Sequence, residues 1–459
     1  MRESIAREFL KSALSKGKNA FQSLDSFWEW FDKKNESGHF VVEEIPFEKL
    51  DKWHIDSESH NISHESGKFF SIEGIRISSN FLEDKSWNQP IINQPEVGIL
   101  GIIVMKFNGV LHFLMQAKME PGNVNILQIS PTVQATKSNY TQVHKGNLPA
   151  YLEYFLDEKG KHEVLFEQVQ PEQSAKFFRK KNNNLIIKVE EDIELKEDFI
   201  WLTLADIIEI SKQDNIMNMD SRSVLSCIQF FKDKKGNRLT QDLLQSINCE
   251  DALFSMEDHN LWLNQLKAKY DFNVDRINLN ELEDWEMNEN KVFHKTKTFF
   301  DVIAVRVEAG NREVVSWTQP LLKDQNEGLI GFLVKRINGI YHFLVQGKFE
   351  PGNQDKIDLS PTISFANWES RISKGDKVPF IEYFHKGKGT VILNIVQSEE
   401  GGRFYHLQNR NMIIDIDAEE IGKVPENFQW MTLGQIYEFI EKGLMNVEAR
   451  SVISCLPIE

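Results

Sequence analysis

The sequence lacks several features that would each indicate a class of protein. It has only three cysteines, Cys227, Cys249 and Cys455, and their wide spacing fits neither a disulfide framework nor a zinc site. No apolar run approaches the ~20 residues that a membrane-spanning helix needs, and the basic N-terminal stretch has no signal-peptide core. We therefore expect a cytoplasmic protein with no membrane partner, and an amphipathic helix at its N-terminus.

Positive charge is also scarce. The 53 Lys and Arg residues stand against 69 Asp and Glu residues, which gives a formal net charge of −16 at pH 7. A negative field repels nucleic acids and anionic membranes, because both bind basic surfaces. We therefore expect no nucleic-acid partner, and a phosphate-bearing ligand has to be small and held by local Lys or Arg residues.

Common catalytic and cofactor-binding motifs are missing as well. The sequence contains no Walker A loop, no strand-associated GxGxxG, no HExxH, no CxxC pair and no GxSxG elbow. We therefore expect neither a cofactor nor a metal.

What the sequence does contain is a long internal repeat. Residues 86–132 and 316–362 align without a gap, and roughly twenty of the 47 pairs are identical. Shorter matches continue in the same order on both sides: LEYF at 152–155 with IEYF at 381–384, FFRKKNNNLII at 177–187 with FYHLQNRNMII at 404–414, WLTLADI at 201–207 with WMTLGQI at 430–436, and SRSVLSC at 221–227 with ARSVISC at 449–455. We expect duplication of a whole domain, with units at 1–231 and 243–459 joined by a hydrophilic linker at 232–242.

Each unit is predicted to be of the α+β class. The hairpin is the clearest element, because the dipeptides Asn108-Gly109 and Asn338-Gly339 favour a two-residue turn between strands. Periodicity and turn residues predict the other elements: helices near 21–32 and 251–268, strands near 68–77, 297–307, 162–170, 391–397, 184–190 and 411–416, and a closing helix after TLADIIEI and TLGQIYEF.

The second strand of the hairpin carries the first candidate site residues. Alternation places polar side chains on one face in both copies, at the same steps. They are His112, Gln116, Lys118 and Glu120 in the first unit and His342, Gln346, Lys348 and Glu350 in the second. We interpret this face as a wall that contacts a ligand; a solvated or structurally bonded face is the alternative.

Other segments contain residues that fit a binding site. The Ser-Pro-Thr triplets and the polar tail of the first copy supply Thr132, Thr362, Gln134, Asn139 and Tyr140. The segment QSEEGGRFYHLQNRN supplies Glu400, Arg403, Asn409 and Asn411, and its paired glycines let the backbone approach a ligand closely. An arginine there suits a phosphate. The alternative is an ordinary connection between strands; in the first copy Lys176 replaces the arginine and the glycines are absent.

Four aromatic residues have two interpretations each. Trp87 and Trp317 precede Gln-Pro in both copies and either pack in the core or stack on a base. Tyr154 and Tyr383 either anchor the sheet or present a hydroxyl group to a substrate.

The ordered blocks SWxQP, NGxxHFLxQxKxEPGN, SPT, EYF, QSEEGGRFYHxxNRN and RSVxSC resemble those of the NDP-hexose 2,3-dehydratases, over nearly the whole chain. This resemblance implies two tandem Nudix-like α/β/α sandwich domains, each with a nucleotide-sugar pocket. It also implies a homodimer that acts on dTDP-4-keto-6-deoxy-D-glucose without a redox cofactor, ahead of a 3-ketoreductase. One pocket per subunit is expected to be catalytic. The carboxylate box of Nudix hydrolases is absent, which disfavours pyrophosphate cleavage.

Removing the C2 hydroxyl of a 4-keto sugar requires a base at C3, a cation near O4 and an acid near O2. Our hypothesis assigns Glu350 or Tyr383 as base or acid and Lys348 as the cation, with Lys118, Glu120 and Tyr154 as their counterparts. Arg403 is expected to hold the diphosphate. Which pocket works stays open, and one possibility is that the halves exchange elements to form a composite pocket.

Three other functions are compatible with these residues. They are a non-catalytic nucleotide-sugar-binding protein, a nucleotide-sugar lyase or epimerase acting at another ring position, and a metal-dependent Nudix hydrolase. The missing carboxylate box makes the last the weakest.

Overall fold

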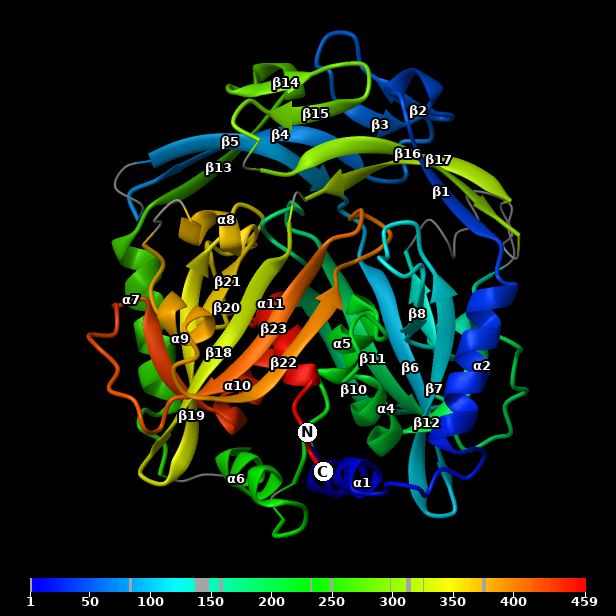
Figure 1. Cartoon of the computed structure of the whole chain (residues 1–459), viewed down its shortest axis with the longest axis vertical. Coiled ribbons are helices and arrows are strands. Elements are labelled where there is room, and N and C mark those ends of the chain that lie inside the picture. Colours follow the sequence, from blue (N-terminus) through cyan, green and yellow to red (C-terminus); the bar gives the residue numbers. More distant parts are fainter. Residues whose placement is uncertain are drawn as a thin grey trace.

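The computed structural model describes residues 2–81, 85–136, 148–156, 160–231, 233–247, 251–297, 299–310, 315–324, 326–373 and 377–459 (Figure 1). These residues form two seven-stranded sheets, one in each half of the chain, and two five-stranded sheets that lie across them at the top of Figure 1. The class is mixed α and β with two repeated halves, as the repeat predicts.

The two seven-stranded sheets have the same topology. In both, the first hairpin strand pairs in parallel with a strand from later in the same half. The first sheet runs β10 (Glu163–Pro171), β11 (Lys181–Lys188), β6 (Gly98–Phe107), β7 (Val110–Met119) and β12 (Phe199–Thr203), with β8 (Leu127–Ser130) on β7 and β9 (Val133–Ala135) on β6. The second runs β22 (Thr390–Ser398), β23 (Gln408–Asp415), β18 (Gly328–Ile337), β19 (Ile340–Phe349) and β24 (Phe428–Thr432), with β20 (Ile357–Ser360) on β19 and β21 (Ile363–Phe365) on β18.

The predicted hairpins are confirmed. Asn108 and Gly109 join β6 to β7 with φ values of 49° and 76°, and Asn338 and Gly339 repeat this with 54° and 81°. A two-residue turn whose central residues both have positive φ matches the twist of antiparallel strands, and Asn-Gly adopts it at low cost.

Helices cover the sheets at matching positions in the two halves. The first half has α1 (Glu3–Ala13), α2 (Leu24–Ser37), α4 (Leu204–Ile210) and α5 (Met219–Leu225), with 3-10 turns η1 (Phe47–Lys49) and η2 (Leu152–Tyr154). The second half has α6 (Arg238–Ile247), α7 (Met256–Lys269), α8 (Trp368–Ser373), α9 (Ile381–His385), α10 (Leu433–Glu441) and α11 (Val447–Ser454), with η3 (Leu279–Glu281).

The N-terminal helix α1 is confirmed as amphipathic, since Phe9 and Leu10 are buried in the core. Ser12 Oγ on this helix donates to Leu111 O at 2.6 Å. Ser246 Oγ on α6 makes the same bond to Tyr341 O at 2.6 Å. Helix α6 is therefore the counterpart of α1, and because it begins at Arg238 the second repeat starts inside the segment predicted as a linker, 232–242.

The upper sheets contain strands from both halves. Strand β1 (Phe40–Ile45) leaves the first half and pairs with β16 (Asp301–Ala309) of the second. Strand β13 (Phe272–Ile277) makes the reverse exchange with β4 (Ser71–Ser79). The remaining strands are β2 (Trp53–Ile55), β3 (Ile62–His64), β5 (Lys85–Asn93), β14 (Trp285–Met287), β15 (Lys291–His294) and β17 (Ser316–Lys323). Neither upper sheet is complete without the other half.

A second exchange occurs at the Glu-Pro-Gly-Asn turns. Gly122 N donates to Gly401 O at 2.7 Å, and Gly122 O accepts from His406 N at 2.7 Å. Gly352 N donates in the same way to Ser174 O at 2.7 Å. The turn of the first half therefore lies against the loop between β22 and β23, and the turn of the second half lies against the loop between β10 and β11.

Replacing Gly122 with alanine tests this docking. An added Cβ would lie 1.7 Å from Phe404 O, a backbone atom that cannot move aside without shifting the loop. We expect Gly122→Ala to lower the free energy of unfolding by about 3 kcal/mol or more, measured by thermal or urea unfolding. Gly422→Ala is the matched control, because nothing lies within 4 Å of its added Cβ and its φ is not positive. Equal stability of the two variants would contradict the docking.

Candidate active site

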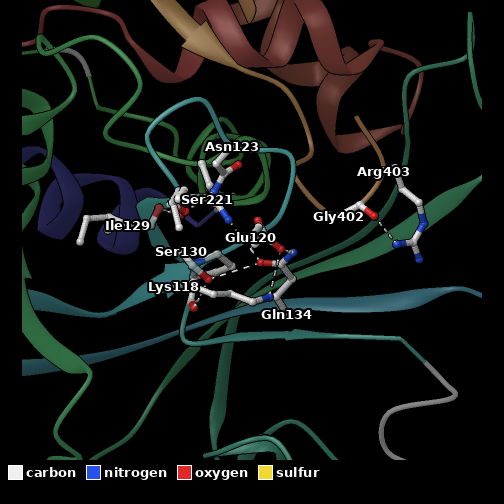
Figure 2. A network of polar contacts seen from close by, with 12 residues as sticks. Lys118, Glu120, Asn123, Ile129, Ser130, Gln134, Ser221, Gly402 and Arg403 are labelled. Atoms are coloured by element: carbon white, nitrogen blue, oxygen red, sulfur yellow. Dashed lines mark hydrogen bonds and ion pairs between the residues drawn. The ribbon is translucent and has the colours of Figure 1, made fainter. Parts of the chain in front are cut away.

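The end of strand β7 carries a tightly packed group of polar side chains. Lys118 Nζ lies 3.4 Å from Glu120 Oε1, and the Glu120 side chain is buried. Gln134, on strand β9, donates from Nε2 to the same Glu120 oxygen at 2.9 Å (Figure 2). Asn218 Nδ2 holds Gln134 Oε1 at 3.2 Å. The Glu120 carboxylate is thus fixed in place by an amide and a cation.

The second half adds residues to this group through the turn exchange. A Cβ built on Gly402 would lie 3.6 Å from Glu400 Oε1 and 3.9 Å from Glu120 Oε1. Gly402 therefore lies beside two carboxyl groups that come from different halves. Gln319 Nε2 donates to Gly402 O at 2.8 Å, so the Gln of the SWxQP motif holds this loop.

Arg403 follows directly in the same loop. Its Nη1 donates to Gly402 O at 2.7 Å (Figure 2). Its Nε donates to Gln94 Oε1 at 3.1 Å. Its Cζ lies 4.2 Å from the centre of the Phe70 ring. An arginine held on a ring face by neutral acceptors keeps its charge and its fork geometry for an anion.

Three further charged residues of the first half surround these groups. Burial and repulsion from Glu400 raise the pKa of Glu172 to about 7. Burial raises the pKa of Asp220 well above its usual value, and Glu400 and Glu172 add to the shift. Burial lowers the pKa of Lys180, and the negative charges of Glu172 and Glu400 oppose this shift. We call the set Lys118, Glu120, Gln134, Glu172, Lys180, Asp220, Glu400 and Arg403 the composite site.

The protonation of Glu400 differs from that of a surface glutamate. Burial raises its pKa; Glu120 adds to the shift and Arg403 opposes it. Carboxyl groups that share a low-dielectric region resist ionising together, which favours the protonated form of some of them. The composite site thus offers protonated carboxyl groups beside cations, which suits acid–base chemistry on an anionic ligand.

The matching residues of the repeat form a second group, which we call the twin site. Lys348 Nζ lies 2.7 Å from Glu350 Oε1 and donates to Ser364 O at 2.8 Å. Burial and repulsion from Glu350 raise the pKa of Glu448 to about 8 and that of Asp358 to about 7. The pairing of a lysine with a buried glutamate is therefore common to both sites.

The two sites differ in the charges around this pair. The repeat alignment places Gln173 opposite Glu400, Leu407 opposite Lys180 and Lys176 opposite Arg403. Lys176 forms an ion pair with Asp324, and the two side chains are 8% and 5% exposed. The twin site thus lacks a counterpart of Lys180, and Lys176, its counterpart of Arg403, is already neutralised by Asp324.

Several predicted ligand-binding residues have structural roles instead. His112 Nδ1 contacts Val110 O at 3.0 Å, and its Nε2 accepts from Ala20 N at 3.0 Å. His342 repeats this with Ile340 O and the Leu253 amide, and both histidines are fully buried. With both ring nitrogens bonded to the backbone, these histidines hold the chain segment that enters each half, and the structure offers no ring nitrogen to a ligand.

The two Ser-Pro-Thr threonines are also structural. Thr132 Oγ1 donates to Leu114 O and accepts from Ile103 N, so it joins β6 to β7. Thr362 Oγ1 donates to Leu344 O at 2.5 Å and accepts from Leu333 N at 2.9 Å. The structure places neither hydroxyl in a site.

The tyrosines and tryptophans lie apart from the charged groups. Tyr383 Oη donates to Glu420 O at 3.0 Å, and Tyr154 packs against His162 with ring centres 5.2 Å apart and ring planes tilted by 36°. Burial raises the pKa of each tyrosine, and nearby glutamates add to the shift. These glutamates do not belong to either site. Trp87 Nε1 donates to Gln89 at 3.2 Å and Trp317 Nε1 to Gln319 at 2.9 Å. Both tryptophans thus support the glutamines that hold the site loops.

The remaining predicted residues divide into three groups. Asn409 binds Glu399, and Asn411 Nδ2 donates to Asn409 O at 3.4 Å, so both belong to the buried sheet near the twin site. Gln116 and Gln346 are half-buried on the predicted strand face. Asn139 and Tyr140 lie outside the described residues.

Sequence reasoning missed Glu172, Lys180, Asp220 and Gln94. Asp220 directly precedes the repeated Arg-Ser-Val block, and Glu448 occupies the same position in the second copy. An acidic residue directly before this block in both copies could have identified Asp220 as a candidate site residue. Within the described ranges there is no group of three or more His, Cys, Asp or Glu residues placed to hold a metal ion, and no helix long and apolar enough to cross a membrane.

Comparisons with known proteins agree over nearly the whole chain. It is 41% identical over 461 residues to the dTDP-4-dehydro-6-deoxy-alpha-D-glucopyranose 2,3-dehydratase of Saccharopolyspora spinosa, covering 98% of this chain and 94% of that one. Enzymes of the same name from Amycolatopsis orientalis and Streptomyces violaceoruber are 38% and 36% identical, covering 93% and 94% of this chain and 88% and 96% of theirs.

The sequence model of one family matches both repeats separately. That family is described as NDP-hexose 2,3-dehydratase, and the matched segments are residues 24–228 and 256–456. These segments contain every residue of the composite and twin sites. The chain therefore belongs to the NDP-hexose 2,3-dehydratase family.

Proposed function

We propose that this chain removes water from dTDP-4-keto-6-deoxy-D-glucose, acting as a hydro-lyase that yields a 3,4-diketo-2,6-dideoxyhexose. The observation that carries the proposal is the composite site, where a lysine, two carboxyl groups and an arginine come together, and where burial raises the pKa of one of the two, Glu400. Full-length relatives carry the name of this activity for a dTDP-linked 4-dehydro sugar. The reaction needs a base, an acid and a cation, and no net oxidation or reduction of the sugar.

The first step is removal of the C3 proton. Glu120 is the base, because Gln134 and Lys118 hold its carboxylate in one position at the edge of the site. The electron pair of the C3–H bond forms a C3=C4 bond, and charge develops on O4. Lys118 stabilises that enolate oxygen, since a cation in a water-poor site acts more strongly than in solution.

The second step is loss of the C2 hydroxyl. The enolate electrons return through C3 to form a C2=C3 bond as the C2–O bond breaks. Glu400 gives its proton to the leaving oxygen, because burial raises its pKa and favours the protonated form. Water leaves, and the C3 enol then moves its proton from oxygen to C2, which completes the diketo sugar.

The diphosphate is held by Arg403, with Lys180 adding positive charge nearby. Each half is proposed to have a Nudix-like α/β/α fold that serves as a nucleotide-diphosphate holder, without the hydrolase chemistry of that fold. The composite site is favoured over Lys348 and Glu350 for catalysis, since it has more cations without a carboxylate partner.

The wider setting follows from the product. A 3,4-diketo sugar is reactive, so the next enzyme is proposed to be a reductase acting at C3. The protein is proposed to be a cytoplasmic homodimer that uses no cofactor.

The proposed activity is tested directly with dTDP-4-keto-6-deoxyglucose in D2O, followed by NMR and mass spectrometry. We expect loss of one molecule of water with deuterium gained at C2, a diketo product or its breakdown product, and no effect of EDTA. Binding without any conversion would favour a nucleotide-sugar-binding protein, and a product altered at another ring position would favour a different lyase or an epimerase.

Isotope exchange distinguishes the roles of the two carboxyl groups, Glu120 as the base and Glu400 as the acid. We expect Glu400→Gln to retain C3 proton exchange with D2O while water loss falls by ~10²-fold or more, because only the acid is removed. Glu120→Gln is expected to lose both exchange and water loss. Water loss at the wild-type rate in Glu400→Gln would contradict the assignment of the acid.

The choice between the two sites is tested with the paired lysines. We expect Lys118→Met to lower kcat by ~10²-fold or more, because the enolate loses its cation. Lys348→Met is the matched variant and is expected to lower kcat by less than ~tenfold. Equal losses of kcat in the two variants, with both proteins folded by circular dichroism, would rule out a single catalytic site.

A further inference from the structure

We propose that Gln94 is a positioning residue whose neutral side chain keeps Arg403 available to the diphosphate of the ligand. This inference rests on the proposed function, since it takes a nucleoside diphosphate as the ligand of the composite site. It goes beyond that function because Gln94 acts on the ligand through Arg403 and does not itself contact the ligand. Gln94 is buried at 3% exposure, directly after strand β5.

The contacts of Arg403 leave one side of its guanidinium open. Nε is held by Gln94 Oε1 at 3.1 Å and Nη1 by Gly402 O at 2.7 Å. Among the described residues, Nη2 makes no hydrogen bond and no carboxylate lies within ion-pair distance of Arg403; Glu400 and Glu120 act on its charge from farther away. Both acceptors are neutral, so they fix the orientation of the guanidinium without cancelling its charge.

The twin site shows what the same place looks like with a charged partner. The repeat alignment places Asp324 opposite Gln94 and Lys176 opposite Arg403. Lys176 Nζ binds Asp324, and it lies 5.2 Å from the ring centre of Phe404. The loop is held in the same way at both places, because Gln89 Nε2 donates to Ala175 O at 2.8 Å just as Gln319 Nε2 donates to Gly402 O at 2.8 Å.

The consequence is electrostatic. A carboxylate at position 94 would occupy the guanidinium as a bonded ion pair and compete directly with a phosphate for its donors. A neutral amide of the same shape cannot compete in this way. The difference between Gln94 and Asp324 therefore decides whether the cation of each site is free to bind an anion.

The experiment measures binding of dTDP to the full-length chain by calorimetry, with thymidine as an uncharged probe. We expect Gln94→Glu to weaken dTDP binding by ~tenfold or more and to raise KM more than it lowers kcat. Gln94→Asn, which shortens the side chain without adding charge, is the matched control and is expected to change the Kd of dTDP much less. Thymidine binding should be equal in all three proteins.

A second variant keeps the test valid if a glutamate at this buried position unfolds the protein. Gln94→Asp combined with Arg403→Lys copies the Lys176–Asp324 pair, which this fold already accommodates at the twin site. We expect a folded protein with weakened dTDP binding. Wild-type affinity for dTDP in this double variant, or equal losses in Gln94→Glu and Gln94→Asn, would overturn the inference.

Failure of the proposed activity gives a different result. A wild-type protein that binds dTDP but leaves the 4-keto sugar unchanged would remove the dehydratase proposal and leave the role of Gln94 standing. A wild-type protein that does not bind dTDP would overturn the role of Gln94.

Discussion

Two buried arginines that cross between the halves hold the site-bearing segments in register. Arg222, on α5, donates from Nε to Ser451 Oγ at 2.8 Å and from Nη2 to Ser398 O. Arg450, on α11, makes the reciprocal bonds to Ser223 Oγ and Pro171 O. Both side chains are at most 1% exposed, so each guanidinium depends on acceptors that the opposite half supplies.

These bonds also place the acidic groups of the two sites. Pro171 O precedes Glu172, and Ser398 O precedes Glu399, so each arginine fixes the backbone beside a buried carboxyl group. Together with the exchanged strands and the docked Glu-Pro-Gly-Asn turns, they make each site a product of both halves. The duplication is therefore more than two copies side by side (Figure 1), because neither half alone contains the residues of one site.

The sequence predicted the repeat, the α+β class and the Asn-Gly hairpins, because these depend on local turn chemistry and strand alternation. It also identified Lys118, Glu120, Gln134, Glu400 and Arg403 as candidate residues. It did not show that β1 pairs with β16, because both copies carry the same strand pattern and pairing within or between halves satisfies it equally. The functional roles of the candidate residues stay predictions.

The histidines and threonines show a different limit of sequence reasoning. Alternation places His112 and Lys118 on the same strand face, but it does not show where another segment covers that face. In the structure Ala20 reaches His112, whereas the strand end that carries Lys118 meets the loop of the other half. Position along the strand, which depends on tertiary packing, separates a structural residue from one at the site.

Comparison of the two copies offers a physical criterion for that separation. Many residues that are identical in both copies, such as Gly122 and Gly352 or His112 and His342, satisfy a packing or backbone requirement that each copy has. Positions with matching places in the repeat but chemically different side chains have no such explanation in the fold. Those positions pair Gln94 with Asp324, Lys180 with Leu407, Glu400 with Gln173 and Arg403 with Lys176. All four surround one lysine–glutamate pair, so the chemical difference between the copies is concentrated where the two halves meet.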